Sequence, residues 1–410
     1  MPMTLYAGAA EADITPAPGL PMDGYAARSG VSAGAHDPLL AQVLVLAESG
    51  RRAAVVALDA LAVSATFALP LRRRLAVLLA TEPDAVLICP SHTHCGPAGL
   101  QDWFPPGSAP PINAQLAEDV AQRVAAAAQQ ALSNLEPTRL SWRAGPVSDI
   151  GGDRNWRGQA ADTQVTVLRF DREGGAPLAF VCHYACHPTI LGPQTLLYSA
   201  DFPGVLRRRL REAYPQSVCL YLNGAAGDIS TRDFRREQTF TEVERLGALL
   251  AQQALRLPEI PVSAAPALSW ETAEVDLPLR ALDSQPTSIA ATGTDRRSQA
   301  QAEGAAVAAQ LAAAFRGQTS VRATLNALRV SGWTLLGVPG EPFSALAARV
   351  RAASSQALVV GYANDYLGYF PTQQAIDAQT YEALSSPYDA RALDAIAAQL
   401  IRTERHSAAT

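Results

Sequence analysis

Residues 53–89 read AAVVALDALAVSATFALPLRRRLAVLLATEPDAVLIC, and this stretch decides the predicted fold. It begins and ends with short apolar runs, Ala53–Leu58 and Ala85–Cys89, and runs of this kind predict buried strands. Between them, Ser64–Leu79 carries apolar side chains at helical spacing. A strand, a helix and a second strand in this order indicate an α/β fold built in layers.

The same alternation of apolar runs and helical segments continues on both sides of this unit. The further predicted strands are Leu5–Ile14, Ala41–Leu46, Gln164–Phe170, Leu178–His183, Val218–Asn223, Val321–Leu328, Trp333–Val338 and Leu358–Tyr362. The further predicted helices are Asn113–Leu132, Pro203–Ala213, Phe240–Leu255, Asp295–Phe315, Pro342–Ala353 and Tyr388–Arg405. We therefore predict an α/β fold with a layered mixed β-sheet core flanked by helices.

No internal repeat or convincing linker divides the chain, so we predict a single domain over residues 1–410. Strands around Ser269–Leu279 make residues 265–330 a candidate for a small β lobe. Two further stretches, Trp103–Pro111 and Ala281–Arg297, are expected to be loops that serve as lids or connectors.

Composition and charge exclude two classes of function. The chain is 48% apolar, but none of its apolar runs approaches the about 18 residues that a membrane-spanning helix needs, so we predict no transmembrane segment. The net charge is −5 and no basic stripe is present, which argues against a nucleic-acid partner. The densest basic run, Arg207–Arg211, is expected to be one solvated helix face. Because the first residues show no secretory signal, we expect a cytoplasmic protein, with an already trimmed mature form as the alternative. The oligomeric state is left open.

The five cysteines are an odd number in a large protein, and this does not predict a disulfide scaffold. A structural zinc site formed by Cys89, Cys95, Cys182 or Cys186 is one alternative. The chain lacks the paired Cys-x-x-Cys motifs that such sites favour. We therefore expect the cysteines to be small buried residues that pack behind neighbouring functional groups.

Histidines are concentrated in two short clusters. The chain has six, and four of them lie in Pro90–Pro97 and His183–Thr189, each directly after an apolar strand. Open α/β sheets commonly place their sites at strand ends. His92 and His94 are two residues apart, which in extended chain puts both rings on one side, where they can share a metal or divide metal binding and acid/base work. A single histidine is more simply a hydrogen-bonded core residue, but two clusters at two strand ends favour a functional site.

Three further segments are candidates for the same site. Glu341 lies in Val338–Phe343 near the start of a predicted helix, where a first-turn acid needs no metal to explain it. The loop Gly361–Thr372 is rich in Tyr and Gly and would by itself indicate aromatic packing. Asn223–Ser230 is a Gly-rich turn at a strand end, but it has neither the Lys-Ser/Thr of a P-loop nor a Gly-x-Ser-x-Gly elbow.

Taken together, six motifs in this order resemble the neutral/alkaline, non-lysosomal ceramidase family. They are Gly8–Pro16, Ser91–Pro97, His187-Pro188-Thr189, Asn223–Ser230, Pro339–Phe343 and Tyr366–Tyr381. The likeness runs across about the whole chain and implies the catalytic-domain fold of that family. It also implies one catalytic zinc ion per chain, held by His92, His187, Glu341 and Tyr369.

The resemblance implies roles for four more residues. His94 is similar to a second histidine beside the reacting water or carbonyl, Arg154 to an active-site arginine, and Tyr381 to a tyrosine that polarises the carbonyl oxygen. A water activated by zinc would attack the amide carbonyl, while His94 delivers a proton to the departing amine. Ser230 would orient water or substrate; a covalent route through it is the lesser alternative, because the sequence shows no neighbouring base. The ligand set would also accept other divalent ions.

The function expected from this resemblance is hydrolysis of an N-acyl amide bond, converting ceramide to sphingosine and a fatty acid. Members of the family usually carry a C-terminal immunoglobulin-like domain and a secretory signal, and we expect neither in this chain. A zinc hydrolase of the same architecture acting on a smaller amide, lactone or ester is therefore an alternative. A third hypothesis, a noncatalytic scaffold with a structural metal, is disfavoured by His94 and Tyr381 beside the expected ligands.

Overall fold

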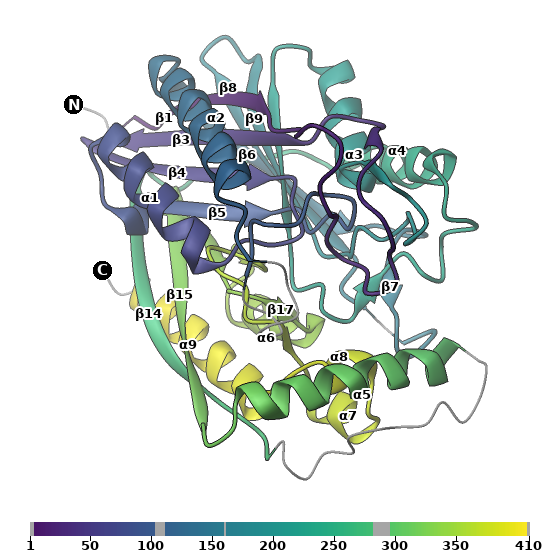
Figure 1. Ribbon diagram of the computed structural model, residues 1–410. Coiled ribbons are helices and arrows are strands. Elements are labelled where there is room, and N and C mark those ends of the chain that lie inside the picture. The colour runs from purple at the N-terminus through teal and green to yellow at the C-terminus, as the bar shows by residue number, and fades with distance from the viewer. Residues whose placement is uncertain (1–3, 103–110, 160, 282–295, 408–410) are drawn as a thin grey trace.

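Two β-sheets pack face to face in the computed structural model, and helices cover the outer face of each sheet (Figure 1). The structure describes residues 4–102, 111–159, 161–281 and 296–407. Within these residues the larger sheet has nine strands and the smaller sheet has four. The predicted α/β fold with a layered mixed sheet is confirmed.

The larger sheet is mixed, with the strand order β11-β9-β8-β6-β1-β3-β4-β5 and β13 beside β6. Only β4–β5 and β9–β11 are parallel among its described pairs, and helices α1 and α3 lie between these strands in sequence, as parallel connections require. The strands are β1 (Tyr6–Asp13), β3 (Leu40–Glu48), β4 (Arg51–Leu58), β5 (Val86–Pro90), β6 (Glu136–Pro146), β8 (Gln164–Arg172), β9 (Pro177–Tyr184), β11 (Val218–Asn223) and β13 (Ile260–Pro261). The helices are α1 (Ala65–Leu79), α2 (Ala114–Ser133), α3 (Asp201–Ala213) and α4 (Phe240–Arg256).

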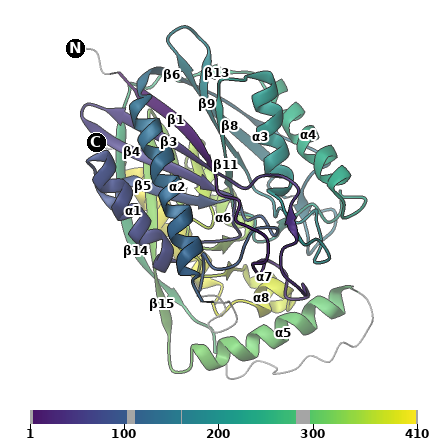
Figure 2. The same ribbon diagram turned by 45° about the horizontal axis from the view of Figure 1, so that its top comes forward.

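The smaller sheet has the order β14-β15-β16-β18. Figure 2 shows its long strands β14 and β15 beneath the larger sheet, with α5 at the far end of the molecule. The strands are β14 (Leu268–Pro278), β15 (Ser320–Val330), β16 (Trp333–Gly337) and β18 (Ala357–Val360), and the helices are α5 (Arg296–Ala314), α6 (Ser344–Ala353), α7 (Gln373–Asp377), α8 (Tyr381–Leu384) and α9 (Arg391–Ser407). Short strand pairs join the loops: β2 (Gly34–Ala35) with β10 (Leu197–Tyr198), β7 (Gly152–Asp153) with β12 (Ile229–Ser230), and β17 (Glu341–Pro342) with β19 (Tyr369–Phe370).

Strand β3 shows why the larger sheet is buried on both faces. Its alternate residues Val43 and Val45 pack into the core beneath α1 to α4, whereas Leu44 and Leu46 pack into the core between the two sheets. Side chains alternate across a strand, so the unbroken apolar run of residues 43–47 in β3 requires cover on both sides. The helices supply one cover and the smaller sheet the other.

The two sheets share that second core. Val55 of β4 and Leu328 of β15 belong to the same buried cluster, and Trp333 of β16 is packed in it at 1% exposure. Residues 265–330, the candidate for a small lobe, supply β14, β15 and α5, and β14 pairs with β15 along its full length. The organisation as one catalytic domain over 1–410 stays a prediction.

Each predicted strand and helix corresponds to an observed element, with ends shifted by three residues or fewer. The prediction missed β6, because Glu136–Pro146 follows α2 almost directly and carries charged residues among its apolar ones. It also missed the short helices α7 and α8. Most of the predicted loops, residues 103–110 and 282–295, lies outside the described residues.

The expectation of one solvated face for Arg207–Arg211 is wrong. Arg207 is 3% exposed, and its guanidinium bonds both carboxylate oxygens of Asp59 at 2.9 and 2.5 Å, because it lies on the side of α3 that faces the sheet. Within the described ranges, the structure has no helix that is both long and apolar enough to cross a membrane.

Candidate metal centre and active site

The two histidine clusters lie at neighbouring strand ends. His92 follows β5, and its backbone N–H donates to the carbonyl of Ala60 at 3.0 Å; its φ of +66° is left-handed, an uncommon conformation for a residue other than Gly. His187 follows β9, and its N–H donates to the carbonyl of Ile229 at 3.0 Å. Both backbones are therefore held by neighbouring segments before either side chain is considered.

All three imidazoles of the site use Nδ1 to hydrogen-bond a backbone carbonyl. His92 Nδ1 lies 2.8 Å from Leu61 O, His94 Nδ1 2.8 Å from Gly24 O, and His187 Nδ1 2.8 Å from Ala226 O. A carbonyl only accepts, so each Nδ1 carries the proton and each neutral ring presents a lone pair at Nε2. Metal-binding histidines commonly have this tautomer, fixed by a carbonyl that accepts a hydrogen bond from the ring nitrogen turned away from the metal.

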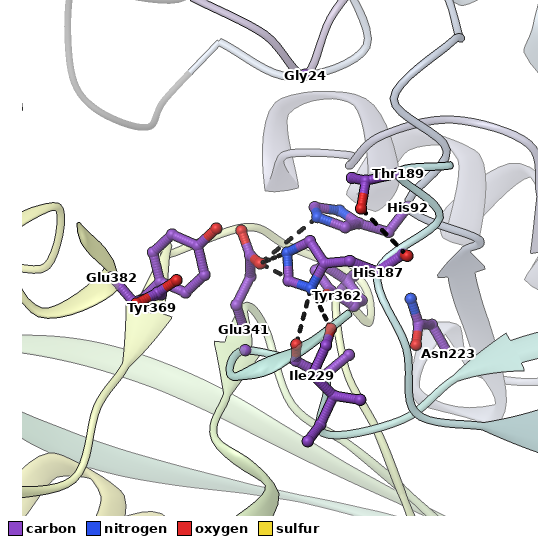
Figure 3. A network of polar contacts seen from close by, with 12 residues as sticks. Gly24, His92, His187, Thr189, Asn223, Ile229, Glu341, Tyr362, Tyr369 and Glu382 are labelled. Atoms are coloured by element: carbon purple, nitrogen blue, oxygen red, sulfur yellow. Dashed lines mark hydrogen bonds and ion pairs between the residues drawn. The ribbon is translucent and has the colours of Figure 1, made fainter. Parts of the chain in front are cut away.

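The three Nε2 atoms and one carboxylate oxygen converge in a buried space. These ring nitrogens lie within 4.8 Å of one another, with 3.3 Å between those of His92 and His94. Oε2 of Glu341 lies 3.4 Å from His92 Nε2 and 3.0 Å from His187 Nε2 (Figure 3). His92, His187 and Glu341 are each 1% exposed or less, whereas His94 is partly exposed. Of these four residues, His94 is therefore the one that solvent reaches.

Burial keeps these rings uncharged. Desolvation lowers the pKa of His92 to about 3, and it lowers the pKa values of His94 and His187 well below the ordinary histidine value. Neutral rings with lone pairs turned toward each other and toward a carboxylate lack a donor between them, and His187 Nε2 is buried without a hydrogen-bond partner. A divalent cation satisfies such a set of acceptors, so the residues fit a metal ion of the zinc type.

Glu341 is placed by strand pairing. Strands β17 and β19 are parallel, and their register sets Glu341 opposite Tyr369. Helix α6 begins at Ser344, after β17, so the interpretation of Glu341 as an acid in the first helical turn is wrong: the residue belongs to a strand. Glu341 and Tyr369, which the family resemblance predicted as ligands of one metal ion, are thus neighbours in the fold, although they are far apart in sequence.

Two tyrosines that were not predicted as site residues contact the Glu341 carboxylate. Tyr366 donates its hydroxyl to Oε1, and the Tyr362 hydroxyl lies 3.4 Å from Oε2. The ring of Tyr362 also stacks on that of His92, with 4.0 Å between centroids. Both tyrosines lie in the Tyr- and Gly-rich loop, so the sequence signal was present, but it did not say which hydroxyl faces the carboxylate.

Arg154 links Tyr369 to a second buried carboxylate. Its guanidinium donates to the Tyr369 hydroxyl at 3.3 Å and to the carbonyl of Gly227 at 2.7 Å. Its Nε lies 2.6 Å from Oε1 of Glu382, and both side chains of this ion pair are less than a tenth exposed. Glu382 was missed, because its neighbour Tyr381 carried the motif and a lone acid on a short helix is not distinctive.

The comparisons with known proteins bear directly on this arrangement. The family model described as neutral/alkaline non-lysosomal ceramidase, N-terminal, matches residues 5–218. The chain belongs to this ceramidase family. Members of the family are amide-bond hydrolases. The matched segment contains His92, His94, Arg154 and His187, whereas Glu341 and the tyrosines of the candidate site lie beyond it.

Relatives and solved structures agree with the family. Neutral ceramidase 1 of Arabidopsis thaliana is 28% identical over 225 residues, which are 50% of this chain and 29% of that protein, so the match spans less than a third of the relative. The crystal structure of neutral ceramidase from Pseudomonas aeruginosa has a TM-score of 0.78 at 21% identity, covering 98% of this chain and 74% of that one. A ceramidase complexed with C2 also has a TM-score of 0.78, at 20% identity, covering 97% of this chain and 74% of that one. At these identities the structural likeness shows a shared fold.

Two further residues that were predicted for the site, Tyr381 and Ser230, also lie beside its other residues. Tyr381 begins α8, and its ring meets that of Tyr369 edge-on, with 6.3 Å between centroids. Ser230 is 4% exposed and forms a backbone bridge to His187. Its Oγ accepts a hydrogen bond from Arg232 N at 3.3 Å, and among the described residues no histidine ring or carboxylate is hydrogen-bonded to this oxygen. The base that a serine nucleophile needs is therefore not beside it.

Asn223 joins the two histidine turns of the ceramidase-family site. Its amide donates to the carbonyls of Ser91 and Cys186 at 3.2 Å each, and its Oδ1 accepts from Cys186 N at 3.2 Å. Strands β11 and β5 are the two end strands of the larger sheet. The hydrogen bond from Asn223 of β11 to Ser91, which follows β5, therefore requires this sheet to curve until the ends of these strands meet. Asn223 thereby sets the spacing between the residues that precede His92 and His187.

His183 and the cysteines do not enter the site. His183 Nε2 lies 2.7 Å from the carbonyl of Val359, on the side of β9 opposite to the helices. All five cysteines are buried and unbridged; Cys89 packs between the sheets, whereas Cys182 and Cys186 pack beneath the helices. Among the described residues, the group of side chains placed closely enough to hold a metal ion consists of His92, His94 and His187 and contains no cysteine, which argues against the structural zinc alternative.

Proposed function

We propose that this protein is a zinc-dependent amide hydrolase that cleaves ceramide into sphingosine and a fatty acid. The observation that carries the proposal is the convergence of three histidine lone pairs and the Glu341 carboxylate in one buried space. Membership of the ceramidase family supports the reaction class, and the neutral ceramidase relative supports the substrate.

The residues that would hold the metal are His92, His187 and Glu341, with Tyr369 as the fourth. Their donor set of two imidazoles, a carboxylate and a phenol is one that zinc accepts, and one ion per chain is expected. When bound, zinc supplies Lewis-acid chemistry that polarises a carbonyl and brings the pKa of water toward neutrality.

The other residues of the site bind, orient and exchange protons. His94 is neutral, and its Nε2 faces the ligands from the exposed side, so this atom can take a proton from water and return it to the departing amine. Arg154, fixed by Glu382, holds the Tyr369 hydroxyl. Tyr381 stands beside Tyr369 and would donate its hydroxyl to the carbonyl oxygen as negative charge develops there. Ser230 would orient water or substrate.

The test combines metal content with hydrolysis on one purified sample. Elemental analysis measures zinc per chain, and a fluorescent short-chain ceramide is hydrolysed with and without a chelator. One zinc per chain with cleavage that the chelator abolishes is the expected result. Zinc without cleavage would overturn the ceramide assignment and favour the smaller amides, lactones and esters, whereas a wild-type protein that binds no zinc would overturn the metal centre.

A further inference from the structure

We propose that Tyr366 is a positioning residue of the metal centre: its hydroxyl fixes the orientation of the Glu341 carboxylate, so that the other oxygen of the group faces the histidines, and it thereby sets the affinity for metal. This inference rests on the proposed metal site. It concerns a residue that would not itself bind the metal, because its hydroxyl contacts the oxygen on the far side of the carboxylate from the rings.

The two oxygens of Glu341 have different partners. Oε1 accepts the hydroxyl of Tyr366, whereas Oε2 faces His187 Nε2 at 3.0 Å and His92 Nε2 at 3.4 Å. Turning the carboxylate out of this orientation would break its hydrogen bond with Tyr366 in a buried place. The contact with Tyr366 therefore fixes the plane of the carboxylate, so that the second oxygen stays directed at the two histidines.

The Tyr362 hydroxyl cannot replace this contact. It lies 3.4 Å from Oε2, the oxygen that already faces the two histidines, and its ring is engaged in stacking on His92. Tyr366 is thus the tyrosine that bonds the oxygen directed away from the ligand cluster.

The segment that carries Tyr366 is anchored on both sides. Oδ1 of Asp365 accepts hydrogen bonds from Tyr366 N and from Ala65 N at the start of α1, both at 2.8 Å. Oδ1 of Asn364 accepts from Ile88 N of β5 at 2.8 Å. The loop is therefore tied to the strand and the helix that flank the first histidine turn, so the hydroxyl is placed by the larger sheet.

The other side of the segment is tied to Glu341 itself. Leu367 N donates to Pro339 O at 3.0 Å, and Glu341 N donates to Gly368 O at 2.8 Å. The ring of Tyr366 is 7% exposed and packs with Ala62 and Leu311. Backbone and ring are both fixed, so loss of the hydroxyl alone would release the carboxylate without displacing the loop.

The first experiment measures zinc affinity of the metal-free protein by competition with a chromophoric chelator. Loss of an outer-shell partner of a metal ligand typically weakens affinity about 10–100-fold, and this is the weakening expected for Tyr366→Phe. Excess zinc should restore a large part of its hydrolytic rate. A matched control is Tyr388→Phe, because Tyr388 is fully buried and its hydroxyl has no hydrogen-bond partner among the described residues; its zinc affinity should equal that of wild type.

A second pair of variants separates the hydrogen bond from packing. At position 366, 4-aminophenylalanine keeps a donor, whereas 4-methylphenylalanine keeps the size without a donor. We expect zinc affinity near wild type for the first and the weakening of Tyr366→Phe for the second, and this pair also decides the matter if Tyr366→Phe does not fold. Equal affinities for the two, within about twofold, would overturn the inference. Failure of the wild-type protein to bind zinc would instead contradict the proposed function.

Discussion

The two halves of the candidate site are held in different ways. The larger sheet contributes His92, His94 and His187, and each of these side chains is oriented by a backbone carbonyl through Nδ1. The smaller sheet and the loops after it contribute Glu341 and Tyr369, which are held through other side chains, above all those of Tyr366 and Arg154.

This difference has a consequence for mutational sensitivity. A backbone carbonyl is present whatever the neighbouring side chain, so the orientation of each histidine ring should tolerate substitution of the residue that supplies its carbonyl. A side-chain partner disappears with one substitution, so the carboxylate half should respond to changes outside the direct ligands. Removing a histidine should have the largest effect, and removing a residue that only orients water or substrate the smallest.

His187→Ala should abolish zinc binding and lower hydrolysis by roughly a thousandfold or more, because metal chemistry supplies several kcal/mol of transition-state stabilisation. The fold should survive, as measured by circular dichroism, and His92→Ala should behave alike. His183→Ala removes a histidine of the same cluster that lies outside the site and should keep its zinc. Full activity in His187→Ala or His92→Ala would disprove the site assignment.

Glu382→Gln should destabilise the protein by roughly 3 kcal/mol and reduce the hydrolytic rate, because it leaves the buried charge of Arg154 without its carboxylate. Urea unfolding measures the first effect and steady-state kinetics the second. Glu118→Gln removes a carboxylate whose Arg74 pair is exposed and should change little. Equal stabilities for the two variants would show that the side-chain-held half is not specially sensitive.

The metal-free protein should lose stability as the pH falls. The pKa of His92 is depressed to about 3 in the folded protein, against about 6.5 in an unfolded chain. Below about 6.5 the unfolded chain therefore binds a proton that folded His92 does not, and the free energy of unfolding declines as the pH falls toward 3. Urea unfolding with a chelator, at pH values of about 7.5 and about 5, measures the difference. The loss should be smaller in His92→Ala; an identical loss in both proteins would show that other groups cause it.

Ser230→Ala should have the smallest effect, a fall in rate of about fivefold or less, as expected for losing one orienting hydrogen bond of about 1 kcal/mol. Zinc content should not change. Abolished activity with zinc retained, together with a burst of the amine product from the wild-type enzyme, would favour the covalent alternative.

Sequence reasoning succeeded where the signal is local. An apolar run followed by a polar turn can be recognised without knowing the fold, and both histidine turns were found in this way. It failed for β6, whose charged residues break the apolar pattern. The alternative interpretation of Glu341 as a first-turn acid was also wrong, because the short strand β17 places this residue before the helix. Sequence reasoning also missed Glu382, which acquires its meaning only beside Arg154.

By itself, the sequence determined the α/β layering and the chemical types available at the strand ends, because hydrophobic period and residue type are properties of short segments. The tertiary structure alone decided which of the loop tyrosines bonds Glu341, that Glu341 lies opposite Tyr369, and that Asn223 joins the two histidine turns. These contacts depend on how the two sheets pack and how the larger one curves. Such long-range geometry follows from the burial of the whole core, and no short stretch of sequence contains it.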